Sequence, residues 1–206
     1  MNTGFYWKDF NNQIANSAQI HPTAYIESKN VRIGERCEIG PNVSILENSI
    51  LEDDIVIRAG AVVGTLGFEF KRILGRIVPV IHAGGVFIHN RVELQANSCV
   101  SKDIFGGFTE IGDDTKIDNL VHIAHGVVIG KRCLLAACAM IAGSVIIGDD
   151  VWIGPSASVS SEIVIGDRAS ITLGSVVTKN VASGQKVTGN FAIDHDRFIS
   201  FLKTIR

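Results

Sequence analysis

Residues 111–148 read IGDDTKIDNLVHIAHGVVIGKRCLLAACAMIAGSVIIG, and an aliphatic residue returns at every sixth position of this stretch. The same step continues to residue 177 without a slip. The residues on it are Ile111, Ile117, Ile123, Ile129, Leu135, Ile141, Ile147, Ile153, Val159, Ile165, Ile171 and Val177. The position after each of them is small or turn-forming in nearly every unit, and the fifth position is compact. A six-residue unit of this kind predicts a short strand followed by a corner.

Three such units predict a triangular coil that buries its aliphatic column inside. Stacked coils pair their backbones as parallel strands about 4.8 Å apart. We therefore expect an all-β fold, a parallel β-helix of roughly eight coils over residues 14–182, after an N-terminal segment of residues 1–13. The spacing alone does not give the handedness of the helix.

The repeat is interrupted at two places. The six-residue step also runs from Ile14 to Val63 with one extra residue, but no period holds between Gly64 and Val86. Between Val100 and Ile111 the spacing is eleven, one short of two units. We expect loops at 64–86 and 101–110, and loops on a rigid scaffold are where binding residues tend to lie.

The last part of the chain has a different pattern. After Asp194, four apolar residues stand at i, i+3, i+4 and i+7: Phe198, Phe201, Leu202 and Ile205. This predicts an amphipathic helix from about residue 194, within a C-terminal extension of residues 183–206, with Asp194 as its N-cap. We expect its apolar stripe to cap the open end of the prism or to pack on a neighbouring subunit.

Composition limits the classes of partner. The net charge of -2 offers no basic field for a phosphate backbone, so we expect no nucleic acid partner. No apolar run reaches the roughly 18–20 residues that a membrane span needs, and the start MNTGFYWKDF lacks the order of a signal peptide. We therefore expect a cytoplasmic protein. The four cysteines show no CxxC spacing and are predicted to be reduced, small buried hydrophobes.

Two segments carry a family resemblance. IDNLVHIAHGVVIG at 117–130 and MIAGSVIIG at 140–148 resemble the left-handed β-helix acyltransferases. Within them the chain looks most like the UDP-3-O-acylglucosamine N-acyltransferases of lipid A synthesis, and next most like the acetyltransferases of nucleotide-linked amino sugars. The resemblance covers about residues 14–190. It implies a left-handed helix, a homotrimer with active sites between subunits, and acyl transfer from a thioester to a sugar amine without a metal.

Two departures from the lipid A enzymes affect the expected substrate. Those enzymes carry a separate N-terminal domain that grips the uridine, whereas about a dozen residues precede the first repeat here. A second histidine of theirs falls on Glu162. We therefore favour transfer of an acetyl group from acetyl-CoA to the amine of a nucleotide-linked amino sugar, for cell-surface polysaccharide. The alternative is a lipid A type N-acyltransferase that uses acyl carrier protein.

Acyl transfer to an amine needs a base and a donor for the oxyanion. His125 follows the inward Ile123 by two positions, so its side chain is expected to leave the wall, and the resemblance implies that it is the general base. Gly143 stands one coil later, so stacking predicts that it lies beside His125. The resemblance implies that the Gly143 N–H is the oxyanion donor and contacts the acyl-CoA.

Further candidates follow from position. Continuing the column by one coil gives Ser161 and then Lys179, which are predicted to contact the pantetheine arm and a phosphate of acetyl-CoA. Asp118 and Asn119 precede His125 by about one unit and are expected to orient it or to hold the sugar, although Asp118 also fits a structural turn. His122 is expected to face outward, at a subunit contact or the substrate.

The irregular segment GTLGFEFKRILGRIVPVIHAGG resembles the loop that covers the sugar-nucleotide pocket in the family. Phe68 and Phe70 would stack on a base or sugar, and Glu69 would accept hydrogen bonds from hydroxyl groups. The alternative is that both phenylalanines only anchor the loop. Trp152 is expected to point outward, at a subunit contact or as a shelf for adenine.

Two other functions were weighed. The γ-class carbonic anhydrases share this type of prism, and His82, His89, His122 and His125 would be the zinc ligands in such a protein. The sequence around His125 matches the acyltransferase motif instead. A non-enzymatic trimeric scaffold would have a regular wall, and the excursion at 64–86 argues against it.

Overall fold

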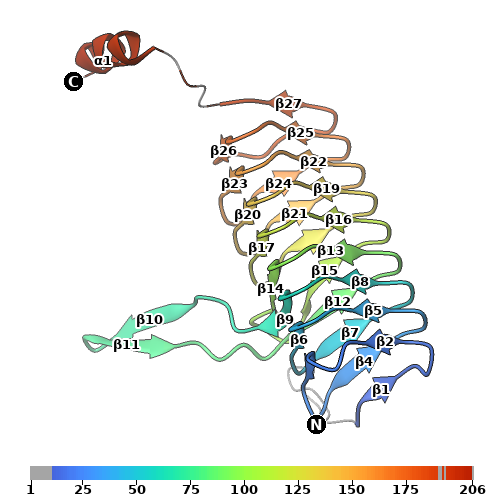
Figure 1. Ribbon diagram of the computed structural model, residues 1–206. Coiled ribbons are helices and arrows are strands. Elements are labelled where there is room, and N and C mark those ends of the chain that lie inside the picture. The colour runs from blue at the N-terminus through green and yellow to red at the C-terminus, as the bar shows by residue number, and fades with distance from the viewer. Residues whose placement is uncertain (1–10, 190–191, 193, 206) are drawn as a thin grey trace.

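The computed structural model describes residues 11–189, 192 and 194–205. It is a tall triangular prism of stacked coils, with one long arm leaving its side and a helix beyond its last coil (Figure 1). The predicted N-terminal segment 1–13 lies mostly outside the described residues. The prism has three walls, each a parallel sheet, and a separate antiparallel pair of strands forms the arm.

The walls take their strands in rotation along the chain. The first wall consists of β1 (Gln13–Ile14), β4 (Val31–Ile33), β7 (Ser49–Leu51), β12 (Gly85–Ile88), β15 (Phe108–Ile111), β18 (Val128–Ile129), β21 (Ile146–Ile147) and β24 (Val164–Ile165). The second wall consists of β2 (Gln19–Ile20), β5 (Glu38–Ile39), β8 (Val56–Ile57), β13 (Glu93–Leu94), β16 (Lys116–Ile117), β19 (Leu134–Leu135), β22 (Trp152–Ile153), β25 (Ser170–Ile171) and β27 (Lys186–Val187). The third wall consists of β3 (Tyr25–Ile26), β6 (Ser44–Ile45), β9 (Val62–Thr65), β14 (Cys99–Ser101), β17 (His122–Ile123), β20 (Met140–Ile141), β23 (Ser158–Val159) and β26 (Val176–Val177).

The core is the predicted aliphatic column. All twelve residues of the regular step from Ile111 to Val177 are buried, and so are the compact fifth positions, such as Val121 and Ala139. The strands pair so that each column residue lies over the one below it, as Ile123 does over Val100 and under Ile141. Burial of this continuous apolar column is the main source of stability in a solenoid.

Three corners join the walls, and they are named here by their residues in one coil. Corner 1 (residues 124–127) leads from the third wall to the first, corner 2 (130–133) from the first to the second, and corner 3 (118–121) from the second to the third. The small residue after each column residue was predicted to be turn-forming, but the left-handed φ falls two positions later, as at Arg132 (φ 56°) after Gly130. Gly130 is small for a different reason, since a Cβ there would lie 2.6 Å from the backbone of Gly148 in the next coil.

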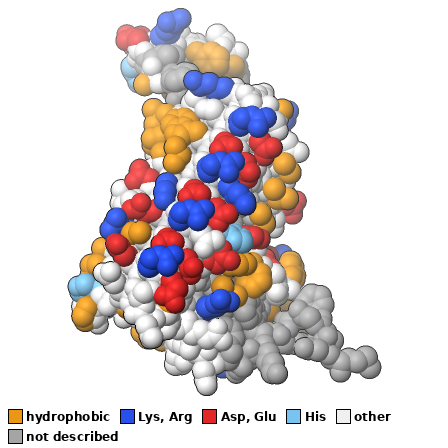
Figure 2. Space-filling view, turned by 90° about the vertical axis from the view of Figure 1, so that its right-hand side faces the viewer, with side chains coloured by type: hydrophobic (Ala, Val, Ile, Leu, Met, Phe, Trp, Pro, Cys, Tyr) orange, Lys and Arg blue, Asp and Glu red, His pale blue; other side chains and the backbone are white. Residues whose placement is uncertain are grey.

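Corner 2 carries a column of alternating charges (Figure 2). Its members occupy the left-handed position of successive coils: Arg36, Asp54, Arg91, Asp114, Arg132, Asp150 and Arg168. Arg132 is bidentate to Asp150, with Nε–Oδ1 2.7 Å and Nη2–Oδ2 2.8 Å. The pairs 36–54 and 91–114 have the same geometry. Hydrophobic side chains lie on both sides of this column (Figure 2).

The two predicted loops both leave the prism at corner 1. The longer one contains an antiparallel hairpin, β10 (Phe70–Ile73) and β11 (Arg76–Pro79), whose eight residues are all exposed. We call residues 65–84 the arm. The shorter excursion, residues 102–107, connects β14 to β15.

The C-terminal extension is partly as expected. Strand β27 adds a further strand to the second wall, beyond the predicted end of the β-helix at residue 182. Helix α1 (His195–Thr204) begins after Asp194, whose carboxylate accepts from the N–H groups of Asp196 and Arg197. The described part of the helix has no buried residue and stands clear of the prism (Figure 1). The expectation that it caps the open end of the prism is therefore wrong, and packing on a neighbouring subunit stays a prediction.

Candidate active site

The candidate site is built around His125 at corner 1. The residue stands just after β17, where the chain turns away from the third wall, so its side chain leaves the wall as predicted and is half-buried. Its ring is held between two glycines. A Cβ on Gly67 of the arm would lie 3.2 Å from His125 Cδ2, and a Cβ on Gly143 would lie 2.7 Å from His125 Nε2. The imidazole therefore occupies a slot that only glycine leaves open on both sides.

Gly143 lies beside His125, as the coil step predicted. The coils are in register here because the Ser144 N–H donates to the His125 carbonyl (3.0 Å). Within the described chain the Gly143 N–H donates no hydrogen bond. At comparable positions of corner 2, the N–H groups of Lys131 and Asp149 each donate to an aspartate Oδ1 of the next coil, at 2.8 and 2.9 Å. Gly143 thus presents an uncommitted N–H next to an imidazole.

The arm brings a carboxylate toward the same ring. Glu69 is half-buried and pairs with Lys71 (2.5 Å). The Lys71 ammonium holds the pKa of the Glu69 carboxyl below its usual range, and His125 and His82 add smaller effects of the same sign. Glu69 therefore lies within electrostatic reach of both histidines, and its predicted contact with substrate hydroxyl groups stays a prediction.

The two phenylalanines of the arm face solvent. Phe68 is 90% exposed and Phe70 is 44% exposed, and their rings contact each other edge to face at 4.9 Å. The alternative that both only anchor the loop stays a prediction. Their predicted stacking on a substrate ring stays a prediction.

The root of the arm is closed by a histidine that the sequence analysis considered only as a zinc ligand. His82 is 3% exposed, and its ring lies edge to face with that of His125, 5.8 Å between centroids. The Gly67 N–H donates to His82 Nε2 (3.2 Å), so the proton of the neutral ring is on Nδ1, which donates to the Val80 carbonyl (3.1 Å).

The shorter excursion supports the other side of the site. Asp103 Oδ2 accepts from the N–H groups of Phe105 and Gly107, at 3.2 and 3.0 Å. A Cβ on Gly126 would lie 2.8 Å from Asp103 Oδ1, so this loop packs directly on the residue after His125. Neither Asp103 nor Gly67 was predicted, because their proximity to His125 arises from loops that carry no repeat; the breaks in the step were the available signal.

Ser161 and Lys179 lie on corner 1 in the two coils beyond Gly143. The register is set by the Glu162 N–H, which donates to the Gly143 carbonyl, and by the Ser160 N–H, which donates to the Val177 carbonyl. Both side chains are exposed, and Lys179 also lines a hollow of about 330 Å³ at the end of the prism. The predicted column is present, and its contacts with an acyl donor stay a prediction.

Asp118 and Asn119 do not lie beside His125. They are at corner 3, where the Ala137 N–H donates to Asp118 Oδ2 (3.1 Å) and the Ala96 N–H donates to Asn119 Oδ1 (3.1 Å). These side chains tie neighbouring coils together, so the expectation that they orient His125 of their own chain is wrong. Their contact with a sugar stays a prediction, as does that of His122, which faces outward from β17 between Cys99 and Met140.

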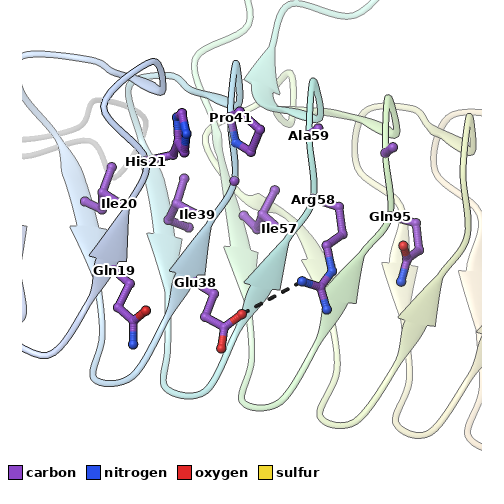
Figure 3. A pocket seen from close by; sticks show the side chains of 12 residues that line it. Gln19, Ile20, His21, Glu38, Ile39, Pro41, Ile57, Arg58, Ala59 and Gln95 are labelled. Atoms are coloured by element: carbon purple, nitrogen blue, oxygen red, sulfur yellow. Dashed lines mark ion pairs between the residues drawn. The ribbon is translucent and has the colours of Figure 1, made fainter.

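A larger hollow, of about 680 Å³, lies at corner 3 of the first coils (Figure 3). Small corner residues, among them Gly40, Pro41 and Ala59, leave it open. Its charged side chains Glu38 and Arg58 pair across it at 3.9 Å (Figure 3). The hollow is on a different corner from His125, and its charges already compensate each other, so the chemistry is placed at His125.

The four histidines of the zinc hypothesis do not form one cluster in this chain. His82 and His125 are neighbours, but His89 lies near corner 2, between Glu52 (3.2 Å) and Glu110 (2.6 Å). Of the described residues, one group is spaced to hold a metal ion: Glu52, His89 and Asp113. The Asn90 amide nitrogen already donates to both of its carboxylates, at 2.7 and 3.2 Å.

The pair at corner 1 has the two functions that acyl transfer requires. An imidazole with no hydrogen-bond partner in the described chain can take a proton, and an uncommitted backbone N–H can bind an oxyanion. A parallel β-helix of hexapeptide repeats with such a pair between coils defines the class of left-handed β-helix transferases. The chain matches the bacterial transferase hexapeptide (six repeats) family over residues 30–65, 108–143 and 144–179, and it belongs to that family.

Two relatives are similar to the chain over much of its length. The chain is 48% identical over 162 residues to "UDP-3-O-acylglucosamine N-acyltransferase 2" of Legionella pneumophila, which is 77% of this chain and 47% of that protein. It is 45% identical over 107 residues to "UDP-3-O-acylglucosamine N-acyltransferase" of Caulobacter vibrioides, 52% of this chain and 31% of that one. The matched part of the chain thus spans less than half of the length of these relatives, 47% of the first and 31% of the second.

Solved structures share the fold. UDP-N-acetylglucosamine acyltransferase of Francisella novicida aligns with a TM-score of 0.73 at 24% identity, over 86% of this chain and 67% of that one. The enzyme of the same name from Campylobacter jejuni aligns with a TM-score of 0.70 at 21% identity, over 95% and 81%. No helix among the described residues is long and apolar enough to span a membrane.

Proposed function

We propose that this chain is an N-acyltransferase that moves an acyl group from a thioester to the amine of a UDP-linked 3-O-acylglucosamine. The observation that carries the proposal is the His125–Gly143 pair at corner 1. The names of the Legionella and Caulobacter relatives supply the substrate class. They favour this substrate over the acetyl-CoA and amino-sugar pair that the sequence analysis preferred.

The reaction needs no covalent enzyme intermediate. The sugar amine attacks the thioester carbonyl, and His125 takes the proton that the nitrogen loses as the C–N bond forms. The Gly143 N–H stabilises the negative charge on the carbonyl oxygen. The C–S bond then breaks, and the proton leaves on the thiol, so that one amide and one thiol are formed.

An apolar strip next to the site supports a long acyl chain. Val128, Ile146 and Val164 stand in register on the first wall and are half-exposed. Val128 follows His125 across corner 1, so the strip starts beside the site and runs along the prism. An acetyl group would leave this strip uncovered, whereas a fatty acyl chain carried by acyl carrier protein would bury it.

The resemblance of the fold supports a homotrimer as the active assembly. In that assembly, Phe68, Phe70, Asp118, Asn119 and His122 would meet substrate held by a neighbouring copy. Exposure of all eight strand residues of the arm hairpin is consistent with a partner surface, because an isolated two-stranded hairpin is marginally stable in water.

The test is thiol release and product formation with two donor and acceptor sets. One set is acyl carrier protein thioesters with UDP-3-O-acylglucosamine, and the other is acetyl-CoA with UDP-, dTDP- and GDP-amino sugars. We expect turnover with the first set and a loss of about a hundredfold or more in His125→Ala. Turnover confined to the acetyl-CoA set would show that the substrates are acetyl-CoA and an amino sugar instead. Full activity of His125→Ala would show that His125 is not the general base.

A further inference from the structure

The arm leaves the prism at Thr65 and returns at Gly84. The shorter excursion holds both of these ends, since the Lys102 N–H donates to the Thr65 carbonyl and the Gly84 N–H donates to the Asp103 carbonyl. Inside the root, the Val80 N–H donates to the Glu69 carbonyl (2.9 Å). Among the described residues, His82 makes the side-chain bridge inside the root, since it accepts from Gly67 on the outgoing segment and donates to Val80 on the returning segment. One imidazole therefore adds a side-chain bridge between the two sides of the root, next to the backbone bond from Val80 to Glu69.

The His82 ring is separated from the His125 ring by one residue, Gly67. A Cβ on Gly67 would lie 2.8 Å from His82 Nε2 and 3.2 Å from His125 Cδ2, so the Gly67 backbone is packed between the two rings. The ring centroids are 5.8 Å apart at an interplanar angle of 72°. Any movement of Gly67 would change the space that keeps the His125 ring against Gly143.

His82 has no capacity left for chemistry. It is almost fully buried, and both of its ring nitrogens have backbone partners. Removing it would leave the Gly67 N–H and the Val80 carbonyl without partners next to a cavity, which costs more than an ordinary hydrogen bond contributes. The bridge explains why a histidine is buried beside the candidate base.

We propose that His82 is a positioning residue that latches the root of the arm and thereby fixes the His125 ring between Gly67 and Gly143. The role in turnover rests on the proposed acyl transfer. The latch itself is a property of the fold and does not depend on the substrate.

The latch requires a neutral ring, because Nε2 must accept from Gly67. Burial lowers the pKa of His82, and the charges of His125 and Lys102 act in the same direction, whereas the Val80 bond and Asp103 oppose them. Glu69 also faces this ring. Since the folded pKa lies below the ordinary value of about 6.5, the latch is complete above that pH. It weakens as the pH falls below that value and is lost as the pH passes through the folded pKa.

Two substitutions separate the bonds from the bulk of the side chain. His82→Gln keeps one acceptor and one donor on a planar group and can bond both Gly67 and Val80. His82→Leu fills similar space with neither bond. His21→Leu is the matched control, because His21 is an exposed corner histidine whose ring bonds only its neighbour Thr23.

Amide hydrogen exchange of Gly67 and Val80 in the full chain tests the latch. We expect exchange at both amides to rise by at least about tenfold in His82→Leu, and to stay near the native rate in His82→Gln and His21→Leu. In native protein, protection at both should fall as the pH is lowered below about 6.5 and through the folded pKa of His82, after correction for intrinsic rates, and this dependence should be absent in His82→Gln. Unchanged exchange in His82→Leu would overturn the latch.

The positioning of His125 has its own measurements. The NMR signals of the His125 ring should move in His82→Leu and not in His82→Gln. Turnover should fall about tenfold or more in His82→Leu, and the same change should have no further effect in a His125→Ala background, because His82 acts through His125. Additive losses or an unmoved His125 signal would overturn the positioning role. Absence of turnover in the native protein would contradict the proposed function. Hydrogen exchange and NMR would still test whether His82 latches the root of the arm.

Discussion

At the scale of single residues, the site depends on the absence of a side chain at Gly143. A strict coil step placed this residue beside His125, and the structure shows why no side chain stands there, since the imidazole fills the position of its Cβ. The backbone of Gly143 is not in the left-handed region, so its conformation does not require glycine. The requirement comes from the histidine alone.

Gly143→Ala should therefore disable the site without unfolding the prism. The new methyl group would push the His125 ring out of its slot, and a displacement of about 1 Å can cost about a hundredfold in rate. We expect a change in Tm of at most about 2 °C and a loss of turnover of about a hundredfold. Gly189→Ala is the control, because a Cβ there meets nothing within 4 Å. A fully active Gly143→Ala would show that the ring is not confined by this glycine.

The cysteines differ in reactivity because they differ in position. All four were predicted to be buried, but Cys138 is exposed at corner 3, and only Cys37 and Cys133 are fully buried. Burial raises the pKa of the Cys133 thiol to about 11, and its S–H donates to the Gly148 carbonyl. Iodoacetamide at pH 8 should label Cys138 within minutes and leave Cys133 unlabelled until the chain unfolds. Mass spectrometry of the native protein measures this, and rapid labelling of Cys133 would contradict the packing of its coil.

At the scale of elements, periodicity predicted the walls and missed the arm. Each wall strand is two to four residues long, and its single inward residue is what repeats, so the column from Ile111 to Val177 could be predicted from spacing. The hairpin of β10 and β11 has no six-residue step, and its two strands pair with each other and not with a wall. Asp118 was misplaced for a related reason. It precedes His125 by about one unit in sequence, and that distance leads to the preceding corner of the same coil.

The charge column at corner 2 gives a pH-dependent contribution to stability. The Arg132 guanidinium holds the pKa of the Asp150 carboxyl below its ordinary value, and Arg36 and Arg91 do the same for Asp54 and Asp114. Since these folded pKa values are lowered, the contribution is present above pH about 3.8 and is lost as the pH falls through the folded values.

Arg132→Ala should lower Tm by about 2 °C or less at pH 7, because exposed ion pairs contribute little. Thermal unfolding should show this difference vanishing as the pH falls through the lowered pKa of the Asp150 carboxyl, and shrinking in 1 M salt. A difference that persists in acid would assign the effect to packing of the arginine stem.

At the scale of the whole molecule, the prism separates its surfaces by function. Corner 1 carries both excursions and the His125–Gly143 pair, corner 2 carries the paired charges, and corner 3 carries the coil-tying Asp118 and Asn119. We expect the walls to contribute to a subunit interface, because apolar side chains remain exposed on them.

The second wall provides the test of the proposed homotrimer. Trp152 is 38% exposed and stacks in register on Leu134, which is also exposed, so the wall presents an apolar surface that an isolated prism leaves in water. We expect the native protein to have three times the 22.1 kDa mass of one chain in light scattering. Trp152→Glu should shift it to the mass of one chain, because an interface would bury the new carboxylate without a partner. Lys186→Glu, an exposed change on the same wall, should leave the mass unchanged. A trimer that survives Trp152→Glu would move the interface to another wall and leave the indole free to contact a ligand.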